Sequence, residues 1–186
     1  KNRLVKIIND DILKFDIEKI VSNNSIIFGN LPYNISTPLI FHLLSYAPIV
    51  KDMHFMLQKE VVDRLAATPG SKAFGRLTVM VQRFFEVRAL SVIPKEAFDP
   101  PPKVWSATVR FNVLDVPMAV SDEVFFTHLV RLAFQKRRKM IKNSLACFFD
   151  PSDFADLPVD GHERPECLSV SDFIALAEAA WLKRAK

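Results

Sequence analysis

The chain has 186 residues, of which 49% are hydrophobic and 25% are charged, so it can bury a core of one or two domains and is not a disordered polymer. Its 25 lysines and arginines outnumber its 21 aspartates and glutamates, which favours anionic partners without naming one. The two cysteines form no CxxC pair and the four histidines have no metal-ligand spacing, so we expect no disulfide and no metal. No apolar run reaches the ~20 residues of a membrane span, so we expect no membrane association and a cytoplasmic protein.

The first third of the chain alternates apolar and turn-forming segments. Residues 4–8 are apolar and β-branched and end at Asn9-Asp10-Asp11, which predicts a strand followed by an acidic turn. Residues 25–28 predict a second strand, which leads directly into Gly29-Asn30-Leu31-Pro32-Tyr33. A helix is expected from Ser36-Thr37-Pro38, because proline is favoured in a first helical turn.

The rest of the chain divides into a mixed part and a helical part. Strands are expected at residues 53–57, 87–93 and 106–113, helices at 59–67 and 77–85, and a loop at the three prolines 100–102. This order indicates a parallel α/β sheet with a hairpin-like antiparallel addition near residue 110. After Pro117 we expect only helices, at 122–134, 136–149 and 170–183. The change predicts two domains, residues 1–116 and 117–186.

The loop Asn30-Leu31-Pro32-Tyr33 carries the strongest chemical signal. Ligands of open α/β sheets gather at the carboxyl ends of strands, so a polar, proline-stiffened, aromatic loop at this place is suited to a flat substrate. The Asn30 oxygen and a backbone carbonyl near Leu31 or Pro32 could accept from an exocyclic amine, and Tyr33 offers a face for stacking. Four such residues in isolation are also typical of an ordinary strand-to-helix turn.

Several longer segments carry a family resemblance. Residues 28–38, 53–61 and 98–104, and in the helical part 134–139 with 143–145, closely resemble the bacterial 16S ribosomal RNA adenine N6-dimethyltransferases of the KsgA type, in the same order and at similar distances. The resemblance implies an α/β, Rossmann-like class I methyltransferase sheet with a small all-helical carboxy-terminal domain. It also implies that S-adenosylmethionine is the methyl donor for dimethylation of N6 of two adjacent adenines during ribosome biogenesis.

The resemblance also implies roles for individual residues. Asn30, Leu31, Pro32 and Tyr33 match the loop that binds and orients the target adenine, and Phe98 matches the aromatic residue that closes over the other face of the base. Cofactor-binding residues would be Asp11, as acceptor from the adenine amino group of the cofactor, and Asn30. Without the resemblance, Phe98 would be interpreted as a core residue and Asp11 as a turn or cap.

A basic segment predicts the nucleic-acid contact. Residues 128–142 contain no acidic residue, and the expected phosphate contacts are Arg131, Lys136, Arg137, Arg138, Lys139 and Lys142. Weaker candidates for the same surface are Arg76, Lys103 and Arg164. By resemblance the partner is 16S ribosomal RNA in the small subunit or its precursor, and the intact enzyme is expected to be a monomer.

One departure from the family limits the expected activity. The four glycines form no Gly-x-Gly loop, and the family's first two strands have no counterpart, so we expect an amino-terminally truncated chain that is inactive by itself. Alternatives are a large-subunit methyltransferase of the resistance type and a non-catalytic RNA-binding ribosome-assembly factor. A DNA amino-methyltransferase is disfavoured, because these usually have Asn or Asp before two prolines.

Overall fold

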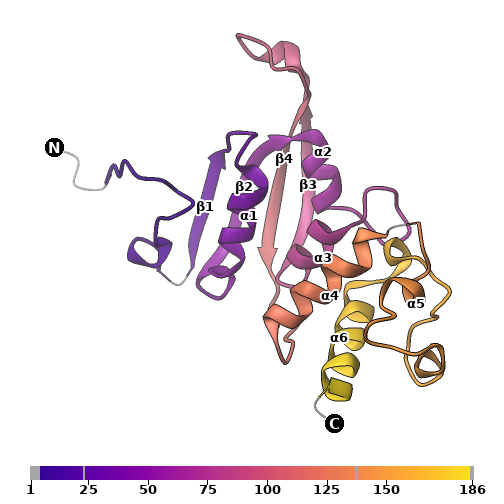
Figure 1. Ribbon diagram of the computed structural model, residues 1–186. Coiled ribbons are helices and arrows are strands. Elements are labelled where there is room, and N and C mark those ends of the chain that lie inside the picture. The colour runs from indigo at the N-terminus through magenta and orange to yellow at the C-terminus, as the bar shows by residue number, and fades with distance from the viewer. Residues whose placement is uncertain (1–4, 23, 137, 185–186) are drawn as a thin grey trace.

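A computed structural model describes residues 5–22, 24–136 and 138–184, and its centre is a four-stranded mixed sheet (Figure 1). The strands are β1 (Ser25–Asn30), β2 (Val50–Gln58), β3 (Phe85–Ile93) and β4 (Ser106–Val113), in the order β1-β2-β4-β3. β1 and β2 are parallel, whereas β4 is antiparallel to both of its neighbours. The prediction of a parallel sheet with an antiparallel addition is confirmed, and β4 lies between β2 and β3.

Three helices cover one face of this sheet. They are α1 (Ser36–Leu44), α2 (Lys59–Leu65) and α3 (Arg76–Gln82), and they lie in front of the strands in Figure 1. Alternate residues of β2, namely Met53, Phe55 and Leu57, are buried beneath them, as period-two alternation requires. α3 ends three residues earlier than expected because Phe85 already pairs with β4 as the first residue of β3.

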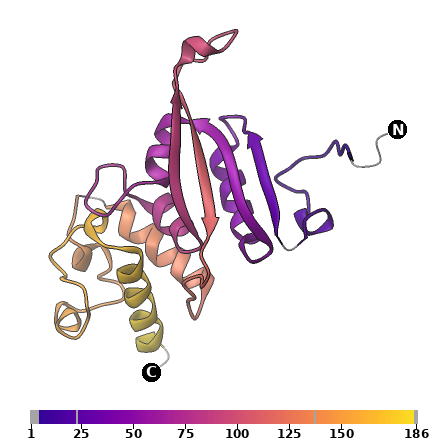
Figure 2. The same ribbon diagram turned by 180° about the vertical axis from the view of Figure 1, so that it is seen from behind.

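The opposite face of the sheet carries no helix from the described residues, as Figure 2 shows from behind. Large apolar side chains are therefore exposed there: Phe28 is 81% exposed, Leu90 56% and Ile26 54%. Exposed apolar patches of this kind usually mark surfaces that contact another element or partner.

The carboxy-terminal helices are α4 (Glu123–Gln135), α5 (Ile141–Ser144) and α6 (Val170–Arg184); α4 and α6 pack against α3, and α5 packs against α4. Asp122 begins α4 as an N-cap whose carboxylate accepts from the Phe125 amide at 2.7 Å. The rings of Phe134 in α4 and Phe173 in α6 stack with centroids 5.4 Å apart. The apolar residues of both parts of the chain form one continuous buried cluster. No helix within the described ranges is long and apolar enough to cross a membrane.

The remaining connections include five short 3-10 turns. These are Ile17–Lys19, Ala47–Ile49, Lys95–Ala97, Pro151–Ala155 and Pro165–Cys167. The turn at 95–97 lies in the extension that projects beyond the sheet between β3 and β4 (Figure 1).

The expected strand at residues 4–8 is wrong for its described part. Residues 5–8 have no regular structure, Ile7 is 90% exposed and Val5 is 69% exposed; Leu4 lies outside the described residues. A β-branched segment becomes a strand only where a neighbouring strand supplies hydrogen bonds and a packed face. No described strand lies beside it, so its β propensity is not realised.

The expected helix at residues 136–149 is also wrong in length. α4 ends at Gln135, Met140 is extended, and only the single turn of α5 follows. The backbone amides of Ile141 and Lys142 donate to the carbonyls of Glu163 and Gly161, at 2.7 and 3.1 Å. This loop contact replaces the hydrogen bonds that a continuous helix would use.

Candidate functional site

Three strand ends meet at one edge of the sheet. β1 ends at Asn30 and β2 at Gln58, and because the two strands are parallel their carboxyl ends lie together. β4 runs in the opposite direction and starts at Ser106, which is paired with Gln58. The loop after β1 and the segment before β4 therefore reach the same edge.

A cavity of about 300 Å³ lies between these two segments. Its walls come from the loop after β1 and from the segment before β4, and the lining residues are Asn30, Leu31, Pro32, Tyr33, Phe98, Pro100 and Pro102. All five residues expected to hold the adenine are thus brought together, although Phe98 lies far from the others in the sequence. Phe98 is half-buried and is not a core residue. The volume is at the lower end of the roughly 300–1,000 Å³ of small-ligand sites.

Hydrogen bonds hold the Asn30–Tyr33 loop in place. The Leu31 amide donates to the Met56 carbonyl at 3.2 Å, which continues the pairing of β1 with β2. The Ser36 hydroxyl donates to the Tyr33 carbonyl at 3.1 Å, and the Tyr33 hydroxyl lies 2.6 Å from the Ser106 hydroxyl. The buried Leu31 side chain anchors the loop, whereas Asn30 stays exposed to solvent.

Asn30 combines exposure with an unused side chain. It is the last residue of β1, it is exposed, and its side-chain amide makes no hydrogen bond with the described residues. The amide oxygen is consequently available to accept from a ligand amine. A flat base in this cavity would meet the Asn30 amide at its edge and aromatic rings from Tyr33 and Phe98.

The structure does not bring Asp11 to this cavity. The Asp11 carboxylate accepts from the Leu13 amide at 3.0 Å and lies 3.7 Å from the Lys14 ammonium, so it stabilises its own turn. In this arrangement the Asp11 carboxylate stabilises a local turn, and its expected contact with the cofactor stays a prediction.

The described residues do not by themselves fit S-adenosylmethionine. Next to Asn30, on the face of the sheet without helices, lies a hollow of about 490 Å³, whose apolar lining includes Phe28, Met56 and Leu90. The same lining includes His54 and Thr108 but no carboxylate that could accept from ribose hydroxyls. Of the residues that the structure describes, Asn30 alone borders both this hollow and the adenine-sized cavity. Among the described residues, no group of acidic, histidine and cysteine side chains could hold a metal ion.

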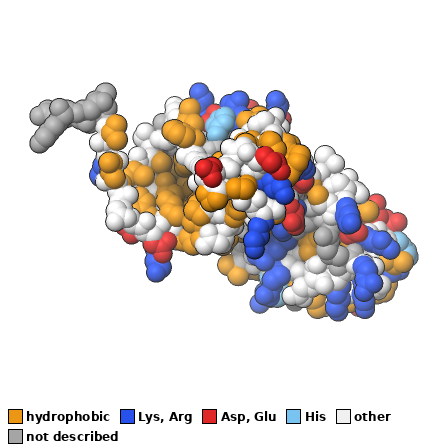
Figure 3. Space-filling model, turned by 90° about the horizontal axis from the view of Figure 1, so that it is seen from above, with side chains coloured by type: hydrophobic (Ala, Val, Ile, Leu, Met, Phe, Trp, Pro, Cys, Tyr) orange, Lys and Arg blue, Asp and Glu red, His pale blue; other side chains and the backbone are white. Residues whose placement is uncertain are grey.

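A basic groove runs along the helical part of the chain. Lysine and arginine side chains gather over this part in Figure 3. One cavity there is lined by Phe134, Gln135, Lys136, Arg138 and Lys139. Of the predicted phosphate contacts, Lys136, Arg138 and Lys139 are thus adjacent, and Arg137 lies outside the described residues. Arg131 instead hydrogen-bonds His128 at 3.0 Å, and Lys142 hydrogen-bonds His162 at 2.7 Å.

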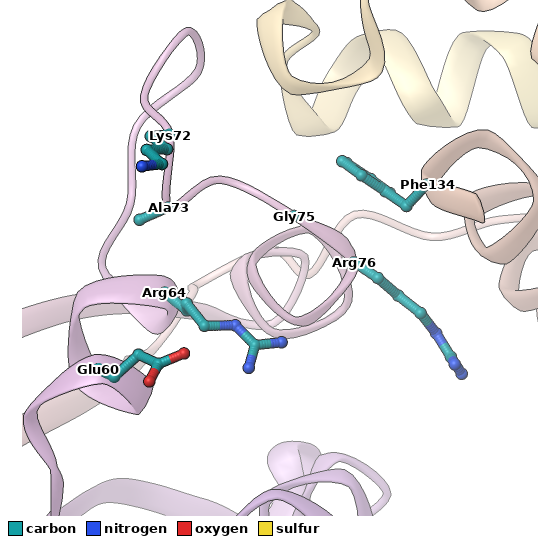
Figure 4. A pocket seen from close by; sticks show the side chains of 7 residues that line it. All are labelled: Glu60, Arg64, Lys72, Ala73, Gly75, Arg76 and Phe134. Carbon is teal, nitrogen blue, oxygen red and sulfur yellow. The ribbon is translucent and has the colours of Figure 1, made fainter. Parts of the chain in front are cut away.

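The basic groove continues toward the sheet, which the sequence did not indicate. A second cavity of about 520 Å³ shares Phe134 and adds residues from α2, α3 and the loop between them: Glu60, Arg64, Lys72, Ala73, Gly75 and Arg76 (Figure 4). Of these cationic residues, the sequence indicates only Arg76, as one of the weaker candidates, and it does not indicate Arg64 or Lys72. The tertiary fold alone gathers them, because no local pattern links α2 to the end of α4.

Asp160 lies close to Lys142, one of the predicted phosphate contacts. Hydrogen bonds from the backbone and then from the ring of His162 lower the pKa of the Asp160 carboxyl, and the charge of Lys142 acts in the same direction. Asp160 therefore stays ionised and orients the His162 ring that contacts Lys142.

The sheet order, the helices on one face and the loop after β1 define a Rossmann-like methyltransferase fold. The structure is similar to a dimethyladenosine transferase from Plasmodium falciparum, with a TM-score of 0.72, 26% identity, and coverage of 91% of this chain and 70% of that chain. It also shares the fold of the 23S rRNA methyltransferase ErmE, with a TM-score of 0.66, 22% identity, and coverage of 92% of this chain and 70% of that chain.

The chain belongs to the ribosomal RNA adenine dimethylase family, whose model matches residues 1–179. It is 48% identical to the ribosomal RNA small subunit methyltransferase A of Thiobacillus denitrificans over 169 residues, and 49% identical to that of Laribacter hongkongensis. These matches cover 89% and 90% of this chain but 65% and 64% of the relatives. The chain therefore spans about two thirds of the length of the relatives it matches.

Proposed function

We propose that the whole protein uses S-adenosylmethionine to dimethylate N6 of two adjacent adenines in 16S ribosomal RNA during ribosome biogenesis. The observation that carries the proposal is the cavity between Asn30 and Phe98, which combines an amide acceptor with two aromatic rings at the carboxyl edge of the sheet. In this proposal residues 1–116 form the catalytic domain and residues 117–186 the RNA-binding domain. The intact protein acts as a monomer.

The adenine is positioned by this chain's own residues. An adenine stacked in a helix does not expose N6 to a cavity, so the base is first turned out of the RNA. The Asn30 oxygen and a carbonyl of the Leu31–Pro32 segment accept from the two N6 hydrogens, and Tyr33 and Phe98 enclose the ring. Bound cofactor supplies an electrophilic methyl group. The protein contributes orientation of the nitrogen, and no strong base is required.

The cofactor is held in part by a segment that these 186 residues do not supply. We expect calorimetry to detect no binding of S-adenosylmethionine to this chain. The extended chain is this chain fused, at its amino end, to the part of the Thiobacillus denitrificans relative that precedes the matched segment. We expect the extended chain to bind S-adenosylmethionine. The same comparison should show methyl transfer only by the extended chain. Equal binding by both proteins would contradict this assignment of the cofactor site.

The RNA backbone is held by the basic groove. Each phosphate contact made by lysine or arginine releases counterions, so affinity falls with salt. Replacing Lys136, Arg138 and Lys139 with alanine should weaken binding of a 16S RNA hairpin and flatten the plot of log Kd against log salt by about one unit per lost contact. The matched control is the triple alanine variant of Lys14, Lys19 and Lys51, which removes equal charge elsewhere. Equal slopes for both variants would exclude the groove as the RNA site.

Two other functions predict different results. A large-subunit methyltransferase would methylate 23S RNA in preference, and the names of the curated relatives favour the small subunit. A non-catalytic assembly factor would bind RNA without methylating it, even as the extended chain. The Asn30 amide in a cavity that two aromatic rings also line favours an enzyme over the assembly factor.

A further inference from the structure

Ser106 is connected to the proposed adenine cavity without lining it. It is the first residue of β4, is fully buried, and pairs through its backbone with Gln58 of β2 and Ile93 of β3. Its hydroxyl lies 2.6 Å from the hydroxyl of Tyr33, a residue on the far side of β2. The hydrogen bond thus crosses the end of β2, at the edge of the sheet where the cavity lies.

The position of Ser106 in the chain gives this bond a second consequence. The segment that leads into β4 carries Phe98, Pro100 and Pro102, which form the opposite wall of the cavity from Tyr33. The backbone at the end of this segment is fixed independently, because the Lys59 amide donates to the Trp105 carbonyl at 2.8 Å. The Tyr33–Ser106 bond therefore connects the Tyr33 wall of the cavity to the fixed end of the segment that carries Phe98.

We propose that Ser106 is a positioning residue, which sets the orientation of the Tyr33 ring and its separation from Phe98 for a planar purine base. This inference rests on the proposed function of the cavity and adds a residue to it. Tyr33 touches the base and Ser106 acts only through Tyr33. Without the bond, the Tyr33 ring would be free to rotate toward the half-open cavity, and a stacked base would be held less rigidly.

A direct test measures stacking of a base analogue on this chain. The probe is a short single-stranded RNA with one 2-aminopurine, whose fluorescence falls when the base stacks on an aromatic ring. Ser106→Ala and Tyr33→Phe should each raise the Kd for quenching by roughly threefold to tenfold, the range of one lost hydrogen bond. The double variant should be no weaker than either single variant, because both remove the same bond.

The control is a hydroxyl pair that joins β3 to β4. Ser91 and Thr108 are paired with hydroxyls 2.7 Å apart on the exposed part of β3 and β4, and neither lines the cavity around Tyr33. Ser91→Ala should leave quenching unchanged. Thermal unfolding of each variant distinguishes loss of base binding from loss of folded protein. In the extended chain, Ser106→Ala should lower kcat for RNA methylation and leave the KM for S-adenosylmethionine unchanged.

The outcomes distinguish the two proposals. If the wild-type chain quenches the probe and Ser106→Ala quenches it equally, the positioning role is wrong and the cavity assignment stands. Additive losses in the double variant would also overturn the positioning role, because they would mean that Ser106 acts independently of Tyr33. If the wild-type chain neither quenches the probe nor, when extended, methylates RNA, the proposed function fails and this inference fails with it.

Discussion

Replacing Asn30 with alanine in the extended chain is expected to lower the rate of adenine methylation by about 100-fold or more, the size of effect seen when a pre-organised hydrogen-bonding group is removed from a reacting centre. Asn30 ends β1 with an exposed amide that has no hydrogen-bond partner among the described residues. Alanine retains the strand but removes the one side-chain amide that, within the described part of the chain, borders the cavity. The rate is measured as transfer of a labelled methyl group to 16S RNA.

The matched control is Asn34→Ala. Asn34 is exposed in the same loop but does not line the cavity, so its loss should leave the rate close to that of the unmodified protein. Asn30→Asp keeps an oxygen acceptor and should lose less activity than Asn30→Ala. RNA affinity should change little in all three variants, because the basic groove is intact. If Asn30→Ala and Asn34→Ala behave alike, Asn30 does not orient the adenine.

The local part of the site could be predicted because its signals are local. An apolar strand followed by Asn30-Leu31-Pro32-Tyr33 and a proline-containing helix start has few alternative conformations, and the structure has β1, the loop and α1 at these positions. The proximity of Phe98 came from the family resemblance and depends on β4 being antiparallel between β2 and β3. No periodicity in the sequence specifies that strand order.

The errors in the prediction have a common physical origin. Residues 5–8 have the composition of a strand and residues 136–149 that of a helix, but each outcome depends on partners elsewhere in the chain. The first segment has no described strand beside it, whereas the second gives the amides of Ile141 and Lys142 to the loop at 161–163. Intrinsic propensity is a weak preference that tertiary contacts can override.

The basic groove illustrates the same limit for function. Lys136, Arg138 and Lys139 are neighbours in sequence and could be recognised as a cluster, but Arg64 comes from α2 and reaches the groove only through folding. Charge patterning along a sequence finds contiguous clusters and misses those assembled by topology. The proposed RNA surface is therefore larger than the sequence indicated, and it extends from the helical part toward the sheet.

Arg83→Ala should cause a large loss of stability, about 2–4 kcal/mol in the free energy of unfolding, since it removes a fully buried side chain together with its packing and its hydrogen bonds. Arg83 is fully buried where α3 ends. Its guanidinium donates to both carboxylate oxygens of Glu123 at 2.7 and 2.9 Å and to the Met118 carbonyl at 3.0 Å. It also lies 4.4 Å from the centroid of the Phe126 ring. These contacts join α3 to the start of α4.

Arg88→Ala provides the matched control, measured with Arg83→Ala by urea unfolding. Arg88 also pairs with a glutamate, Glu86, at 2.7 Å, and this pairing lowers the Glu86 pKa, but both side chains are largely exposed to water. Solvent screens such a pair, so its removal should leave the midpoint almost unchanged. Arg83→Lys should be intermediate, because an ammonium keeps the charge but not the planar, two-pronged geometry. Equal midpoints for Arg83→Ala and Arg88→Ala would mean that the helical part is held to the sheet by apolar packing alone.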